Sequence, residues 1–116
     1  MLFSITTDEA GRYVCDLADG PEHTTVTASN VPEAGADLLA ALEDARDSGL
    51  GESLWSEPGG DYRWMFRRVG HQLTIAVMWC SGTVIGWQHV FRAECNFEAF
   101  VAQAREAMAR VTPANA

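Results

Sequence analysis

The chain has no lysine, and all eight of its basic residues are arginine. Against these stand 16 acidic residues, which give a formal net charge of −8 at pH 7. A surplus of negative charge repels the phosphates of nucleic acids. The composition therefore argues against a protein that binds DNA or RNA directly, although it leaves open an acidic protein that occupies a nucleic-acid-binding surface.

Cysteine is scarce as well: Cys15, Cys80 and Cys95 are an odd number and lack the spacing of a metal site. This favours a reduced, cytoplasmic protein. Residues Met1–Asp8 lack the basic region and the apolar core of a signal peptide. No apolar run approaches the roughly 20 residues of a membrane span.

Motifs that carry chemistry are also missing. His23, His71 and His89 have no ligand spacing to one another or to cysteine, which predicts no metal site. The one nucleophile that can be paired with a base is Cys80, with His71 or His89 as the base. The carboxylates fall in turns and on the polar side of a helix, where solvated charges are the ordinary interpretation. We therefore predict no catalytic residue, no cofactor and no enzyme.

What is present fits one folded domain. The hydrophobic fraction is 47% over 116 residues, enough for a core of its own. Residues 1–48 predict three strands and a helix, residues 49–60 a connector, and residues 61–112 again three strands and a helix. Consecutive short turns favour antiparallel meanders with helices packed on them. The expected fold is α+β with the order βββα–βββα.

The element boundaries follow from periodicity and from turn and cap residues. The helices are expected to begin after the N-cap residues Asn30 and Asn96, and Gly49 is expected to end the first one in a left-handed conformation. The expected strands are Leu2–Thr7, Arg12–Ala18, His23–Ser29, Asp61–Val69, Gln72–Cys80 and Thr83–Cys95.

The second meander is predicted to be apolar on both faces. Turns at Gly70-His71 and Ser81-Gly82 would place Val69 opposite Gln72 and Cys80 opposite Thr83. One face would then carry Tyr62, Trp64, Phe66, Leu73, Ile75, Val77, Trp79, Val84 and Val90. The other would carry Met65, Ala76, Met78, Cys80, Ile85, Trp87, Phe91 and Ala93, mixed with Arg63 and Arg67. Three explanations are open. A helix or the connector covers each face, or a bulge at Gly86 changes the direction in which the side chains of the last strand point. Alternatively, the Met78/Trp87/Phe91 face binds a partner.

Charge is divided unevenly along the chain. Residues 1–60 hold twelve acids and two arginines, a net of −10, whereas residues 61–116 hold four acids and six arginines, a net of +2. Such a field favours a partner with a basic surface. The predicted partner-binding residues are Glu43, Asp44, Asp47 and Glu52 for charge, with Trp55 and Trp87 as aromatic anchors.

One stretch carries a family resemblance. A capped helix from Leu38 leads into Gly49-Leu50-Gly51-Glu52-Ser53-Leu54-Trp55-Ser56, and an aromatic meander follows from Tyr62. Over about two thirds of its length, the chain resembles small single-domain proteins of actinomycetes and related bacteria. Its best-marked positions are Gly51 and the Trp55…Asp61 spacing. Members of this group are uncharacterised or are assigned as immunity proteins of polymorphic-toxin systems. The resemblance implies a cytoplasmic, non-catalytic protein that binds and blocks a toxin domain.

Three hypotheses follow. The first is a protein-binding module, of the immunity type, that meets a basic toxin or effector domain. The second is a small-ligand-binding or enzymatic domain with an aromatic pocket around Tyr62, Trp64 and Trp79. The third is a homo-oligomeric scaffold, with a homodimer formed through the second meander.

Overall fold

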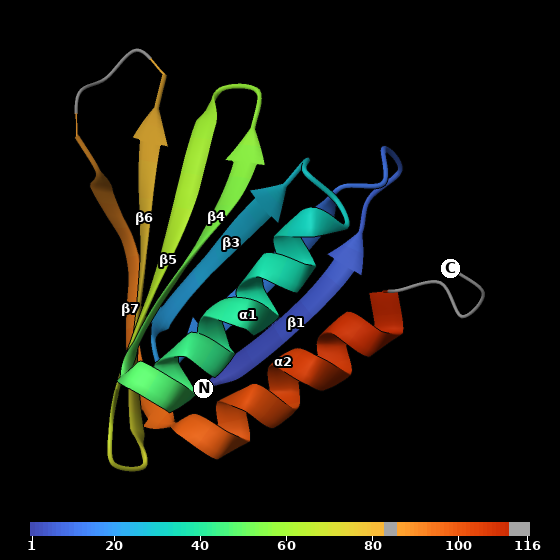
Figure 1. The fold of residues 1–116 in the computed structure, drawn as a ribbon. Helices are drawn as coiled ribbons and strands as arrows, with labels where there is room; N and C mark the ends of the chain where they lie inside the picture. The colour runs from blue at the N-terminus through green and yellow to red at the C-terminus, as the bar shows by residue number, and fades with distance from the viewer. Residues whose placement is uncertain (83–85, 112–116) are drawn as a thin grey trace.

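The computed structural model describes residues 1–82 and 86–111. It confirms an α+β fold made of two antiparallel sheets and two helices (Figure 1). The first sheet has the order β1-β2-β3, and the second has the order β4-β5-β6-β7. The strands are β1 Leu2–Thr7, β2 Tyr13–Asp19, β3 Glu22–Ala28, β4 Leu50–Glu57, β5 Gly60–Val69, β6 Gln72–Ser81 and β7 Gln88–Asn96, and the helices are α1 Glu33–Ser48 and α2 Phe97–Val111.

The expected connector over residues 49–60 is wrong, because most of it forms strand β4. β4 pairs with β5 in antiparallel register, with Gly51 opposite Phe66 and Trp55 opposite Tyr62. The second half of the chain is therefore ββββα. Gly51, Ser53 and Trp55 point inward and are all buried, so the buried side of this strand contains a glycine and a serine. That composition conceals the alternation by which strands are recognised.

The helix ends follow the predicted signals in part. Gly49 ends α1 in a left-handed conformation with φ of 88°, and its N–H donates to the Ala45 carbonyl. The Asn96 side chain accepts a hydrogen bond from the N–H of Ala99 at 2.9 Å, which confirms the cap of α2. The expected cap of α1 is wrong, since Pro32 stands at that position without a side-chain bond. The Asn30 side chain instead accepts the N–H of Ser56 in β4, at 2.9 Å.

The pairing of β5 with β6 matches the predicted register, with Val69 opposite Gln72 and Trp64 opposite Val77. The predicted pairing of the last strand is wrong, because Leu73 lies opposite Cys95 and Val77 opposite Phe91. An irregularity between Val77 and Met78 shifts the register. The predicted strand Thr83–Cys95 begins at Gln88 in the structure, and residues 83–85 lie outside the described residues.

The core lies on the helix side of both sheets. Helix α1 packs on β4 and β5, α2 packs on β1, and the two helices contact each other (Figure 1). Phe91 and Ala93, expected on the opposite face, are buried in this core with Trp64 and Phe66. The rings of Trp55 and Trp64 are 5.1 Å apart, and Phe3 from the first sheet meets the edge of Phe100 at 5.2 Å. Aromatic residues from both sheets and from α2 therefore form one continuous core.

The side of the β4–β7 sheet that points away from both helices is called the outer face below. Among residues 1–82 and 86–111, no helix or strand packs on it. The expectation that a helix or the connector covers each face of the second meander is thus wrong for this part of the chain. Neither helix has the length and the apolar composition that a membrane crossing requires, within the residues described.

Candidate protein-interaction surface

The exposed side of α1 is lined with acids. Glu33, Asp37, Asp44 and Asp47 are all exposed, and we call these four residues the acidic stripe. Helical periodicity places them on one side because they are separated by whole turns of the helix. Asp44 and Asp47 make no ion pair with any residue in the described ranges 1–82 and 86–111. Their charges are therefore available to a partner.

Glu43, also predicted for partner binding, is already engaged within the chain. Its carboxylate pairs with Arg46 at 3.4 Å on the same helix and with Arg105 of α2 at 2.5 Å. Arg46 in turn donates to both carboxylate oxygens of Glu98, and these hydrogen bonds lower the pKa of that carboxyl. Glu43 thus belongs to a network that joins α1 to α2, and it contributes less free charge than Asp44 or Asp47.

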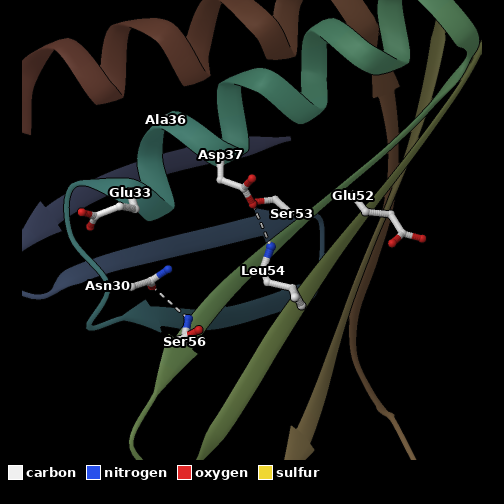
Figure 2. Close-up of a pocket in the computed structure, with 8 residues that line it drawn as sticks. All are labelled: Asn30, Glu33, Ala36, Asp37, Glu52, Ser53, Leu54 and Ser56. Carbon is white, nitrogen blue, oxygen red and sulfur yellow. Dashed lines mark hydrogen bonds between the residues drawn. The ribbon is translucent and has the colours of Figure 1, made fainter.

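A groove of about 720 Å³ lies between the first half of α1 and strand β4 (Figure 2). Its walls combine acidic, amide and hydroxyl side chains with two apolar ones. They are Asn30, Glu33, Ala36, Asp37, Glu52, Ser53, Leu54 and Ser56. Three carboxylates and one amide line this groove, and none of its lining residues is basic. It therefore offers hydrogen-bond acceptors and negative charge to a bound partner.

Two side chains of this groove also hold the edge of the sheet. Asp37 accepts hydrogen bonds from the Ser53 hydroxyl at 2.7 Å and from the Leu54 N–H at 3.0 Å (Figure 2). Asn30 accepts the N–H of Ser56 beside them. These bonds replace those that a neighbouring strand would make, which is a usual protection of an edge strand. Sequence reasoning missed both roles because it assigned no strand here.

The remaining predicted residues fall in different places. Glu52 points to the outer face, where it pairs with Arg63 at 2.5 Å. Trp87 is 39% exposed, and the Arg63 guanidinium lies 5.6 Å from its ring centre. Trp55 cannot serve as an anchor in this structure: its side chain is fully buried, and its indole N–H donates to the Ala34 carbonyl at 3.1 Å. The prediction failed because Trp55 was placed in a connector and not in a strand.

The paired arginines form no joint patch. Arg67 is exposed on the outer face, whereas Arg68 points to the other side and packs against Phe97. Arg68 donates to the carbonyls of Ala45 at 3.1 Å, Arg46 at 2.9 Å and Gly70 at 2.9 Å. Its guanidinium is therefore committed to the C-terminal end of α1, where the helix carbonyls favour a cation.

The residues considered for chemistry are histidines and cysteines. Within residues 1–82 and 86–111, no cluster of three or more potential metal ligands is present. Cys80 lies near the end of β6, and His71 lies in the turn at the opposite end of that strand. The other candidate base, His89, lies on β7 opposite Met78, two residues from Cys80. Burial raises the pKa of the Cys15 thiol well above its usual value, which disfavours the reactive thiolate.

The space around Trp64 is filled by neighbouring side chains. Its ring lies 5.1 Å from Trp55, 6.1 Å from Phe66 and 6.2 Å from Phe3. Its indole N–H is buried and has no hydrogen-bond partner in the described part of the chain. The ring centres of Tyr62 and Trp79 are 4.6 Å apart, with the ring planes tilted by 51°. Trp64 is thus enclosed by other aromatic rings, whereas Tyr62 and Trp79 are half-buried, and the aromatic pocket stays a prediction.

Comparisons with known proteins add no family to this description: no family model, curated protein or solved structure matches the chain.

Proposed function

We propose that the chain is a cytoplasmic, non-catalytic protein-binding module of the immunity type, and that its partner presents a basic surface. The observation that carries the proposal is the acidic stripe of α1, in which Asp44 and Asp47 have no ion-pair partner among the described residues. Unpaired surface charges of one sign raise association rates with an oppositely charged partner. The sequence resemblance to immunity proteins of toxin systems points the same way.

The groove beside the stripe supports the same kind of partner. It continues the acidic surface with Glu33 and Asp37 and adds the apolar side chain of Leu54, which is 48% exposed. Leu50, at the start of β4, is 63% exposed. Charge beside exposed apolar groups suits a basic segment that also carries apolar side chains, since interfaces combine a hydrophobic centre with a polar rim.

The test compares two variants of equal net charge. In the first, Asp44→Lys and Asp47→Lys reverse the unpaired part of the stripe. In the control, Glu9→Lys and Glu22→Lys reverse two exposed acids of the first sheet, one in the turn before β2 and one at the start of β3. Each immobilised protein captures partners from a lysate of its native cells. We expect the wild type and the control to retain a basic protein that the stripe variant loses.

The rate of association with the purified partner then provides the decisive measurement. Stopped-flow mixing at low salt should show association slowed by roughly tenfold for the stripe variant, with a weaker dependence on salt. The control should keep both the rate and the salt dependence of the wild type. Equal rates for the two variants would contradict the proposal, because net charge alone would then account for any steering.

A further inference from the structure

The outer face of the β4–β7 sheet has side chains in regular rows across its four strands. The row at its centre runs Glu52 on β4, Met65 on β5, Ala76 on β6 and Arg92 on β7. The centre of this row is thus apolar, and its two ends carry opposite charges. An antiparallel sheet with a solvated side usually shows polar residues across that side, so apolar residues at the centre call for a partner.

The neighbouring rows combine one or two apolar side chains with charged and polar ones. On one side the row consists of Leu54, Arg63, Met78 and His89, and on the other it consists of Leu50, Arg67, Thr74 and Glu94. A shallow groove of about 340 Å³ lies over this second row and the central one. Its walls include Leu50, Met65 and Ala76, and its charged members are Glu52 and Arg67.

We propose that the outer face binds a second copy of this chain, with the two sheets packed face to face around a twofold axis. The axis runs parallel to the strands, between β5 and β6. This operation places β4 of one copy over β7 of the other and keeps each row over itself. Glu52 of each copy then lies opposite Arg92 of the other, and the Met65 and Ala76 side chains meet at the centre.

Charge selects this arrangement over the alternative. A twofold axis across the strands would place Glu52 over Glu52 of the other copy and Arg92 over Arg92, and would bring Arg63 over Arg67. Like charges in contact disfavour a partner by a large margin, whereas two Glu52–Arg92 pairs favour the first arrangement. The face is therefore self-complementary in one orientation and repulsive in the other, which is the property of an isologous interface.

The ion pairs that Glu52 and Arg92 make within the chain do not prevent these two residues from pairing with a second copy. Glu52 pairs with Arg63 at 2.5 Å, and Arg92 pairs with Glu94 at 3.2 Å. The Glu52 and Arg92 side chains are 54% and 57% exposed, so both carboxylate and guanidinium keep access to a second partner. Exposed pairs of this kind contribute little on their own, so sharing them with another copy carries a small cost.

The size of the face sets the strength of the dimer. Strands about 4.8 Å apart and alternate residues about 6.8 Å apart give a face of roughly 500 Å² for four strands and four rows. Two such faces would bury on the order of 1,000 Å² in total, which is near the lower limit of a specific interface. We therefore expect a weak and reversible dimer and not an obligate one.

The experiment uses charge reversal and its rescue. Sedimentation equilibrium on the full chain, from about 10 µM to about 1 mM, covers the range in which so small an interface dissociates. The wild type should show a monomer–dimer equilibrium. Glu52→Arg and Arg92→Glu should each weaken it by about tenfold or more, because each variant creates two repulsive contacts per dimer. The double variant, with both charges exchanged, should regain most of the lost affinity.

Two controls make the result specific. Glu22→Arg changes net charge by the same amount as Glu52→Arg, at an exposed position of the first sheet, and should leave the dimer intact. Circular dichroism and the thermal midpoint establish that each variant is folded. A wild type that stays monomeric at the highest concentration would overturn the proposal. So would a double variant as weak as the single ones, or a Glu22→Arg variant as weak as Glu52→Arg. Partner capture through α1 is measured separately, so either proposal can fail alone.

Discussion

Replacing Gly51 by alanine tests the close packing of α1 on β4. A methyl group at this position would overlap the carbonyl oxygen of Ala41 and lie 2.9 Å from its carbonyl carbon. Both atoms belong to the backbone of α1, so no side-chain rotation relieves the overlap. The helix has to move away from the strand as a body.

The expected loss of stability depends on which contacts of α1 are disturbed when the helix moves. Over-packing in a core costs about 1–3 kcal/mol when neighbours adjust locally. Here the shift also loosens the contacts of Leu38, Leu42 and Ala45, which are buried on the same side of the helix. We therefore expect Gly51→Ala to lower the free energy of unfolding by about 3 kcal/mol, at the upper end of that range. At about 4 °C per kcal/mol for a domain of this size, the thermal midpoint should fall by about 12 °C.

Urea unfolding, followed by circular dichroism, measures this loss. The midpoint should fall while the m-value stays constant, as expected for a change of stability alone. Gly59→Ala is the matched control, because a methyl there would meet no atom within 4 Å. It should change stability by less than about 1 kcal/mol. A Gly51→Ala variant within roughly 0.5 kcal/mol of the wild type would refute the close contact between α1 and β4.

Two further predictions concern single side chains. Arg68→Met keeps the apolar stem but removes three hydrogen bonds to backbone carbonyls. The free energy of unfolding, measured in urea, should therefore fall by about 2 kcal/mol. An unchanged free energy would show that these bonds do not stabilise the C-terminal end of α1. Cys15 ionises near pH 9.0 when unfolded and well above it when buried. Because the unfolded thiol loses its proton first, this group's contribution to stability should decline as pH rises above about 9. Labelling of the native protein with iodoacetamide should modify Cys95 before Cys15, and equal rates would contradict the burial of Cys15.

The elements that the sequence predicts well are those set by local chemistry. The Gly70-His71 turn fixes the register of β5 against β6, because a two-residue turn leaves one way to pair the strands. Asn96 caps α2 through its own side chain. Asp44 and Asp47 are exposed as the period of the helix requires. In each case, residues a few positions apart determine the outcome.

The elements that it predicts poorly depend on distant contacts. β4 has Gly51 and Ser53 on its buried side because the backbone of α1 approaches it there, and neither residue type signals a core strand. The register of β7 depends on an irregularity beside Val77, and no residue type marks that shift in advance. The misplacement of Trp55 as an anchor follows directly from the missed strand.

The protected sheet edges restrict how this protein can bind others. On β4, the side chains of Asp37 and Asn30 accept backbone N–H groups at the strand edge. On β1, Gln103 of α2 accepts the Phe3 N–H at 3.2 Å and donates to the Met1 carbonyl at 3.4 Å. A partner that adds a strand to either edge would first have to displace these bonds. Binding at these two edges is therefore disfavoured, which leaves the edges of β3 and β7 and two side-chain surfaces: the acidic stripe on α1 and the outer face of the β4–β7 sheet. Glu52 and Leu54 of β4 border both the groove beside the stripe and the outer face. A dimer formed through the outer face would therefore compete with a partner that fills the groove, but it would leave Asp44 and Asp47 of each copy open.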